Sequence, residues 1–250
     1  MTDDLKLCEP DRCALFLDVD GTLIDIEDHP GDVVADPALL ELLERIAARL
    51  DGALALVSGR TLQEIDRIFS PRRFAAAGGH GAELRLPDGT RADPESVELP
   101  AAVLNDFRRF AGCHDGLLLE EKPAGLSLHY RRAPELETEA RRFAESALQS
   151  LGSDFRLIDG KMVLELTPAG NGKDNAIRLF LERRPYRGRT PVFVGDDVTD
   201  EDGFRYVNDR GGLSVRAGEA EDSAARYAMT GVREVRRWLR QQFSIDADNT

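Results

Sequence analysis

Cysteine is scarce in this sequence: Cys8, Cys13 and Cys113 are the only three cysteines among 250 residues. The number is odd, and no two of them have the spacing of a metal-binding or redox motif. A small domain held together by several disulfides is therefore excluded. We expect all three thiols to be reduced, as in a reducing compartment.

Positive charge is also in short supply. The chain has 33 Lys and Arg residues against 46 Asp and Glu residues, which makes the formal net charge −13. An acidic surface repels the phosphates of nucleic acids and the head groups of anionic membranes, so we expect neither as a partner. An anionic substrate must instead meet a local cluster of positive groups, with a metal ion.

Long apolar runs are absent. No run approaches the roughly 20 residues that a helix needs to cross a bilayer. The first ten residues, MTDDLKLCEP, carry acids where a secretion signal carries bases, so we expect a cytoplasmic protein. With 42% hydrophobic residues, the length suits one large or two small domains at about 150 residues each.

Three short apolar runs are present, and none alternates in polarity. They are Ala14–Leu17, Ala53–Val57 and Pro191–Val194. Such runs are typical of strands that are buried on both faces. Helical patterns lie between them, one beginning at Asp36 and Pro37 and the next at the capping box of Thr61 and Glu64. The alternation predicts an α/β core with a doubly wound, Rossmann-like parallel sheet.

The middle of the chain follows a different pattern. Residues 100–166 are predicted to form a helix, a hairpin that turns at 122–125, a second helix and a second hairpin. The second hairpin is predicted to turn at Asp159–Gly160, because an Asp-Gly pair strongly favours a hairpin turn. We therefore predict an inserted α+β cap domain at 100–166, within a core domain made of 1–99 and 167–250.

Polar residues follow each of the three apolar runs. They are Asp18, Asp20 and Thr22 after the first run, Ser58, Gly59 and Arg60 after the second, and Asp196 and Asp197 after the third. In an open parallel sheet, ligands bind at the carboxyl ends of the strands. Carboxylates that converge there repel one another unless a cation neutralises them, and Mg²⁺ prefers hard oxygen ligands. These residues therefore predict a Mg²⁺ site that recruits a phosphate, with Asp18 or Asp20 as a possible nucleophile and Lys173 as a candidate cation.

The motif Asp18-Val19-Asp20-Gly21-Thr22-Leu23 resembles the signature of haloacid-dehalogenase-type phosphotransferases. Ser58, Lys173 and the Gly195–Asp197 run stand in the order of that superfamily's remaining motifs. More narrowly, the chain resembles the trehalose-6-phosphate phosphatase family. The residues that carry this resemblance are 195–201 (GDDVTDE), 58–60 (SGR), 79–83 (GHGAE), Glu120 with Lys122, 129–131 (HYR), and Lys161 with Glu165.

The resemblance implies a Mg²⁺-dependent phosphatase that hydrolyses trehalose 6-phosphate through an aspartyl-phosphate. It implies that Asp18 is the nucleophile and that Asp20 is the general acid and base. The other implied roles fall into four groups: phosphate binding by Thr22, Ser58, Gly59 and Lys173; metal binding by Asp18, the Asp20 carbonyl and Asp196; support of the metal by Asp197 and Asp200; and substrate binding by Arg60, His80, Glu120, Lys122, Arg131, Lys161 and Glu165. A trehalose-phosphate synthase is a candidate partner.

The sequence leaves other functions open. The core motifs read only the phosphate, so the substrate could be another ester such as sucrose phosphate or mannosyl-phosphoglycerate. A phosphomutase would share the aspartyl chemistry, and a non-catalytic phosphatase-like module would share the fold. In the cap, His129 and Tyr130 are neighbours in a strand, so one of them faces away from the substrate and packs.

Overall fold

The computed structural model describes residues 9, 12–26, 33–93, 97–122, 125–160, 162–219 and 222–245. The chain divides into two compact units, Met1–Asp93 with Lys173–Thr250 (unit 1) and Pro94–Gly172 (unit 2). Within the described ranges, every helix is too short or too polar to cross a lipid bilayer.

Unit 1 is built on a seven-stranded sheet with the strand order β11-β10-β9-β1-β2-β3-β4. Its strands are β1 (Cys13–Leu17), β2 (Leu54–Val57), β3 (Ala76–Gly78), β4 (Glu83–Arg85), β9 (Thr190–Gly195), β10 (Leu213–Ala217) and β11 (Tyr227–Met229). All neighbours pair in parallel except β3 and β4, which are antiparallel. The chain order runs outward from β1 in both directions, so the predicted doubly wound sheet is confirmed.

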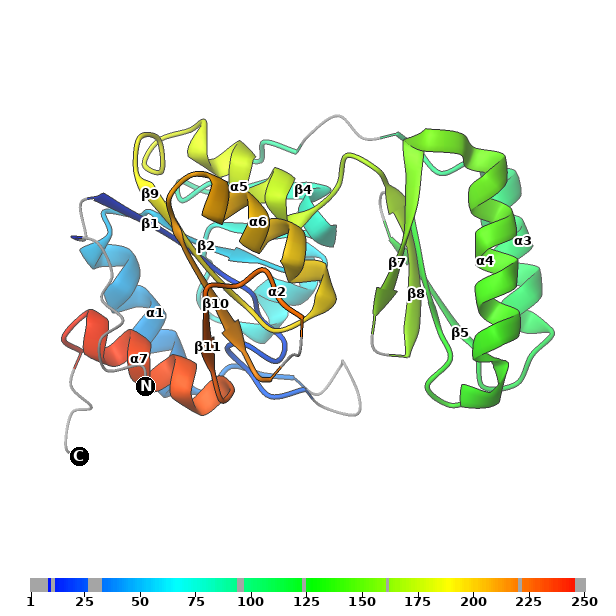
Figure 1. Cartoon of the computed structure of the whole chain (residues 1–250), viewed down its shortest axis with the longest axis horizontal. Coiled ribbons are helices and arrows are strands. Elements are labelled where there is room, and N and C mark those ends of the chain that lie inside the picture. Colours follow the sequence, from blue (N-terminus) through cyan, green and yellow to red (C-terminus); the bar gives the residue numbers. More distant parts are fainter. Residues whose placement is uncertain are drawn as a thin grey trace. The chain divides into compact units, whose positions relative to one another are not determined.

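Helices cover both faces of this sheet. They are α1 (Pro37–Arg49), α2 (Leu62–Ile68), α5 (Lys173–Leu181), α6 (Glu201–Asp209) and α7 (Val232–Gln242). The helices α5 and α6 lie together on one side of the sheet, and α1 and α7 lie on the other (Figure 1). The predicted caps are confirmed: Asp36 accepts a hydrogen bond from the amide of Leu39, and Thr61 forms a capping box with Glu64.

An arginine on α7 links this helix to the loop after β1 and to the start of α1. Arg236 Nε donates to the carbonyl of Leu23, in the loop that follows β1. Its Nη1 donates to Asp36 Oδ2 at 2.5 Å, at the N-terminus of α1. The last helix therefore supports the segment that continues from Asp20 and Thr22.

The strand β1 lies at the centre of the core of unit 1. Every residue of β1 is buried, as are the apolar residues of β2 and β9 on either side of it. The ring of Phe16 packs against Phe180 of α5 and stacks on Tyr186, with centroids 5.9 and 5.6 Å away. Full burial of each such apolar side chain contributes about 1.5–3 kcal/mol. This packing fixes the position at which β1 ends.

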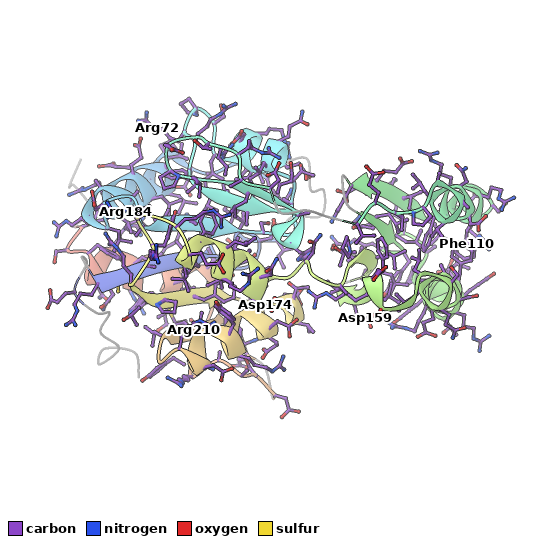
Figure 2. The ribbon with its side chains drawn as sticks, turned by 90° about the horizontal axis from the view of Figure 1, so that it is seen from above. Arg72, Phe110, Asp159, Asp174, Arg184 and Arg210 are labelled. Atoms are coloured by element: carbon purple, nitrogen blue, oxygen red, sulfur yellow. The ribbon has the colours of Figure 1, made fainter. Side chains whose placement is uncertain are left out.

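Unit 2 is a four-stranded antiparallel sheet with two helices on one face. The strands are β5 (Leu118–Lys122), β6 (Gly125–His129), β7 (Phe155–Gly160) and β8 (Val163–Pro168), in the order β5-β6-β8-β7. The helices are α3 (Ala101–Gly112) and α4 (Glu137–Leu151). Figure 2 shows Phe110 between these two helices, where it stacks on Phe143 with ring centroids 4.1 Å apart. Gly152 caps the C-terminus of α4.

Three expectations about local structure need correction. The predicted turn at Asp159–Gly160 is wrong, because both residues lie in β7 and pair with Leu164 and Val163. The strands β3, β4, β10 and β11 were not predicted, since they are short and lack long apolar runs. The expectation of reduced thiols is wrong for Cys13, which is disulfide-bonded, whereas Cys113 is a free and exposed thiol.

Candidate active site

Three strands of unit 1 end side by side at one edge of the sheet. Leu17 of β1 is level with Val194 of β9 and with Leu56 of β2. The residues that follow these strands, Asp18, Asp196 and Ser58, therefore emerge at the same edge. This is the carboxyl edge on both sides of β1, where the strand order reverses and where ligands bind in such sheets.

Asp18 lies in a closed network of buried charges. Lys173, the first residue of α5, donates from Nζ to Asp18 Oδ1 at 2.7 Å and to Asp200 Oδ1 at 2.5 Å. The three side chains are 5% exposed or less. A buried charge is tolerated only when it is paired and hydrogen-bonded, and each of these three has such a partner.

Asp200 holds the loop after β9 in place. Its Oδ2 accepts hydrogen bonds from the amides of Asp196 and Asp197, both at 2.9 Å, while its Oδ1 accepts from Lys173. Both oxygens of Asp200 are thus engaged in positioning other groups. Asp197 accepts from the amide of Val198 at 2.7 Å and caps the short helical turn that follows.

The electrostatics of the cluster favour a cation. Burial raises the pKa of Asp18 well above its usual value; the Lys173 ammonium opposes this shift, and the carboxylates of Asp200 and Asp196 add to it. Burial and Asp200 likewise raise the pKa of Asp196 to about 7. Burial alone would lower the pKa of Lys173, but Asp18 and Asp200 raise it above its usual value. One ammonium therefore faces three carboxylates.

The donor atoms of this cluster suit a hard divalent ion. Asp18, Asp196 and Asp200 each offer a carboxylate oxygen, and these oxygens lie within 4.8 Å of one another. Gly21 brings the loop after β1 against the same place, because a Cβ atom there would lie 2.0 Å from Asp196 Oδ2 and the residue has φ +76°. The hydroxyl of Thr22, which is fully buried, donates to Asp196 Oδ1 at 3.5 Å. Oxygen-only donors of this kind are those that Mg²⁺ prefers.

The loop after β2 brings a second positive charge to this edge. Arg60 makes two parallel hydrogen bonds with Asp20, from Nε to Oδ2 at 2.6 Å and from Nη2 to Oδ1 at 2.7 Å. The amide of Arg60 donates to Ser58 Oγ at 3.1 Å. Ser58 itself is 2% exposed. Arg60 therefore contacts the side chain of Asp20 directly.

His80 packs under this loop. It is buried and has φ +55°, a left-handed conformation that a non-glycine residue rarely adopts. Its amide donates to the carbonyl of Ser58 at 3.1 Å. A Cβ atom on Gly59 would lie 2.6 Å from His80 Nε2, so only glycine fits beside the ring.

Unit 2 carries a separate group of charged residues on the face of its sheet that the helices leave open. Side chains alternate between the two faces of a strand. On the open face, Lys122 Nζ lies 3.3 Å from Glu165 Oε1, and His129 Nε2 lies 3.0 Å from Glu120 Oε2. The opposite face carries the buried leucines 126, 128, 164 and 166, which form the core of the unit with Phe107.

Comparison with known proteins agrees with this geometry. The sequence pattern of the trehalose-phosphatase family matches residues 16–233. The chain belongs to the trehalose-phosphatase family. It is 43% identical over 215 residues to a probable trehalose-phosphate phosphatase of Sinorhizobium fredii, a match that covers 83% of this chain and 78% of that one. It is also 41% identical over 232 residues to the trehalose-6-phosphate phosphatase of Escherichia coli K12, covering 91% and 85%.

A solved structure of another family relative has the same fold. The crystal structure of a trehalose-6-phosphate phosphatase related protein superposes with a TM-score of 0.74 at 26% identity, covering 92% of this chain and 97% of the other. The trehalose-phosphatase fold thus extends over both units of the chain.

Most of the residues singled out for the family site fall into these two groups. In unit 1, the structure brings together Asp18, Asp20, Thr22, Ser58, Gly59, Arg60, His80, Lys173, Asp196, Asp197 and Asp200. In unit 2, it brings together Glu120, Lys122 and Glu165. Arg131 is exposed in the turn after β6 and makes no hydrogen bond or ion pair with another described residue. Lys161 lies outside the described residues.

Two residues of unit 2 were undecided or missed in the sequence. His129 shares the open face with Glu120, whereas Tyr130 is 4% exposed and packs in the core. Ser127 was missed, although the register places it directly between Glu120 and Glu165. Its Oγ is buried and has no hydrogen-bond partner among the described residues. The alternation of β6 could have placed both residues on the face of Glu120, once the strand pairing was known.

Proposed function

We propose that this chain hydrolyses trehalose 6-phosphate to trehalose and phosphate through an aspartyl-phosphate on Asp18. The observation that carries the proposal is the position of Asp18, buried at the end of the central strand and held by Lys173 beside Asp196, in a chain of the trehalose-phosphatase family. A carboxylate attacks a phosphate dianion only where positive charge offsets their repulsion, and Lys173 together with a divalent ion held by the carboxylates would supply that charge.

The reaction would take place in two displacements. In the first, an oxygen of Asp18 forms a bond to phosphorus while the bond from phosphorus to the sugar oxygen breaks, and the carboxyl group of Asp20 gives its proton to that oxygen. In the second, a water molecule attacks phosphorus, gives a proton to the Asp20 carboxylate, and the bond to Asp18 breaks. Trehalose and phosphate leave, and both aspartates return to their starting states.

Phosphoryl oxygens need donors during both displacements. The candidates are the Lys173 ammonium, the hydroxyl groups of Thr22 and Ser58, and the backbone of Gly59. Lys173 Nζ donates to Asp18 Oδ1, so it lies within reach of a phosphoryl group bonded to the Asp18 carboxylate. Ser58 Oγ accepts from the amide of Arg60, which leaves its own proton free to donate.

The donor set also supports Mg²⁺ as the cofactor. Asp18, the main-chain carbonyl of Asp20, and Asp196 would hold the ion, while Asp200 and Asp197 fix the loop that carries Asp196. Bound there, Mg²⁺ would neutralise the carboxylates and offset the charge of the phosphoryl group. Asp200 is less suited to be a ligand, because both of its oxygens already accept hydrogen bonds from protein groups.

The open sheet face of unit 2 is the candidate for reading the sugar. Glu120, Lys122 and Glu165 are charged groups in fixed positions, and such groups bind the hydroxyls of a sugar well. We propose that residues 100–166 form the cap domain that carries this face. Residues 1–99 and 167–250 then form the catalytic core. Arg131 and Lys161 stay candidates on the strength of the motifs alone.

A phosphate-release assay tests the proposal. The purified chain is supplied with trehalose 6-phosphate, sucrose phosphate, mannosyl-phosphoglycerate and glucose 6-phosphate, each with Mg²⁺ and with a chelator. We expect phosphate release to be fastest with trehalose 6-phosphate and to be lost with the chelator. A preference for another ester would assign a different sugar-phosphate substrate. Absence of phosphate release from every ester would leave a non-catalytic module, and transfer of phosphate back to sugar would indicate a mutase.

Two further expectations concern the setting of the enzyme. A trehalose-phosphate synthase would supply the substrate and is a candidate partner; co-purification of the two proteins would test it. The cytoplasmic location expected from the acidic N-terminal sequence also stays a prediction, and fractionation of cells that produce the protein would test it.

A further inference from the structure

We infer that Arg60 is a positioning residue that acts through Asp20, keeping its carboxyl group at the site from which one of its oxygens reaches the leaving oxygen. The inference rests on the proposed function, since it assigns the general acid and base to Asp20. The sequence suggested a different role for Arg60, that of binding the substrate. The structure places the whole guanidinium edge, Nε and Nη2, on the two carboxylate oxygens of Asp20.

The geometry of this pair restricts Asp20 in a way that a single hydrogen bond would not. Two parallel donors at 2.6 and 2.7 Å fix both the position and the plane of the carboxylate. The Arg60 side chain is 12% exposed and that of Asp20 is 31% exposed, so the pair is partly shielded from water. A second carboxylate, Glu64 Oε1, lies farther from the guanidinium, at 3.9 Å from Nη1.

Arg60 is itself held firmly. Its carbonyl accepts from the amide of Gly79 at 2.9 Å and its amide donates to Ser58 Oγ. Gly59 is wedged against the ring of His80. The next residue, Thr61, caps α2. Because the backbone of Arg60 is held in this way, its side chain has few alternative rotamers. The guanidinium therefore fixes the position of the Asp20 carboxylate.

The consequence for the reaction follows from the bonding of the carboxyl group. When Asp20 carries a proton, one of its oxygens is a donor and must turn from Arg60 toward the leaving oxygen. The other oxygen can keep its bond to Arg60, which then holds the side chain at the site. Without Arg60, the side chain samples other rotamers, and protonation of the leaving oxygen becomes the step that suffers most.

A series of aryl phosphates whose leaving groups differ in pKa isolates that step. These esters carry no sugar, so a contact between Arg60 and sugar cannot influence them. For wild type, Arg60→Ala, Arg60→Lys and Asp20→Asn, log(kcat/KM) is plotted against the pKa of the leaving phenol. Arg91→Ala is the matched control. Arg91 also donates to an aspartate, Asp93, from two nitrogens, but it follows β4 in the sequence, is not a residue of the site, and has a side chain that is 49% exposed.

We expect Arg60→Ala to steepen the plot. Esters with the poorest leaving groups should lose about 100-fold in kcat/KM, and 4-nitrophenyl phosphate should lose less than about threefold, because a good leaving group does not need the proton. Arg60→Lys should fall between wild type and Arg60→Ala, and it decides the question if Arg60→Ala fails to fold. In the Asp20→Asn background, Arg60→Ala should cause little further loss. Arg91→Ala should follow the wild-type line.

Three results would overturn the inference. A parallel shift of the whole line would assign Arg60 to the phosphate. An unchanged line, with loss confined to trehalose 6-phosphate, would assign it to the sugar. Full additivity with Asp20→Asn would separate the two residues. The proposed function is judged separately, from wild-type turnover of trehalose 6-phosphate; a wild type that cleaves aryl phosphates but not this sugar phosphate would contradict the function and leave the plot informative.

Discussion

The charged cluster around Asp18 in unit 1 and the charged face of unit 2 are built in different ways. Around Asp18, the ion pairs join residues as far as 155 positions apart, and the side chains are at most 5% exposed. In unit 2, the pairs span 43 positions or fewer, lie on strands β5, β6 and β8 of one sheet, and are 12–38% exposed. A buried network tolerates no unpaired charge, whereas a partly exposed face can exchange partners with water.

This difference predicts two kinds of response to substitution. Changes in the unit 1 cluster should disrupt chemistry with any phosphate ester. Changes on the open face of unit 2 should leave the chemistry intact and alter the choice of substrate. The following four experiments challenge that contrast.

The largest effect is expected for Asp18→Asn. An amide cannot form the phosphoenzyme, so turnover should fall by on the order of 10⁴-fold or more with every ester. Phosphate release measures the loss, and thermal unfolding shows whether the variant folds. Hydrolysis at the wild-type rate by this variant would rule out Asp18 as the nucleophile.

Asp200→Asn should have the next largest effect. The amide group cannot accept all the hydrogen bonds that the two carboxylate oxygens accept from Lys173, Asp196 and Asp197. The loop that carries Asp196 should loosen, and Mg²⁺ affinity, measured by calorimetry, should fall roughly 10–100-fold. Asp202→Asn is the control, since Asp202 lies on the neighbouring helix α6, has a side chain that is 45% exposed, and pairs with Arg205. Equal Mg²⁺ affinity in both variants would contradict this role of Asp200.

Lys122→Ala tests the other side of the contrast. It removes the partner of Glu165 and a donor to the sugar, so kcat/KM for trehalose 6-phosphate should fall by about 10-fold or more. The value for 4-nitrophenyl phosphate should not change. Arg108→Ala is the control, because Arg108 pairs with Glu121 on the opposite face of the same strand. A proportional loss with both substrates would mean that unit 2 affects the chemistry itself.

The smallest effect is expected for Glu120→Gln, and it concerns the free energy of unfolding. The hydrogen bond with His129 lowers the pKa of Glu120 below its usual value of 4.5; burial opposes this shift, and the charge of Lys122 adds to it. A carboxyl group whose pKa is lowered by folding stabilises the folded state above its usual pKa, and this contribution disappears as the pH falls through the folded-state pKa.

Glu120→Gln should therefore lower the free energy of unfolding by less than about 1 kcal/mol at pH 7, since the pair is partly exposed to solvent. The difference from wild type should shrink as the pH falls below 4.5. Denaturant unfolding at several pH values measures it. A difference that grows in acid would show that the pKa of Glu120 is shifted in the opposite direction.

The sequence predicts the central part of the fold well. The three apolar runs became β1, β2 and β9, and the caps at Asp36 and Thr61 formed as expected, because these features depend on local composition and on short-range hydrogen bonds. The strand β3, with the sequence AAG, forms instead because it pairs with β2, and a pattern read along the sequence does not reveal that pairing. The second hairpin turns beyond Asp159–Gly160 because β7 and β8 pair through Gly160 and Val163.

The candidate site divides along the same line. Motif order indicated which residues of unit 1 would gather, since strand ends in a parallel sheet share one edge. It could not show that Arg60 faces Asp20 instead of solvent or substrate, because that contact joins two loops from different strands. On the unit 2 face, the choice between His129 and Tyr130 required the strand register, which a single strand cannot supply.

The link between α7 and the loop after β1 has a consequence for shortened forms of the protein. Arg236 reaches back across 213 positions to the carbonyl of Leu23, one residue after Thr22. A chain truncated ahead of Val232 would keep every motif residue but lose this support together with the buried core side chains of Val235, Trp238 and Leu239. Activity should then decay faster on warming than in the full chain, so deletions at the far end of the gene can imitate damage to the catalytic loop.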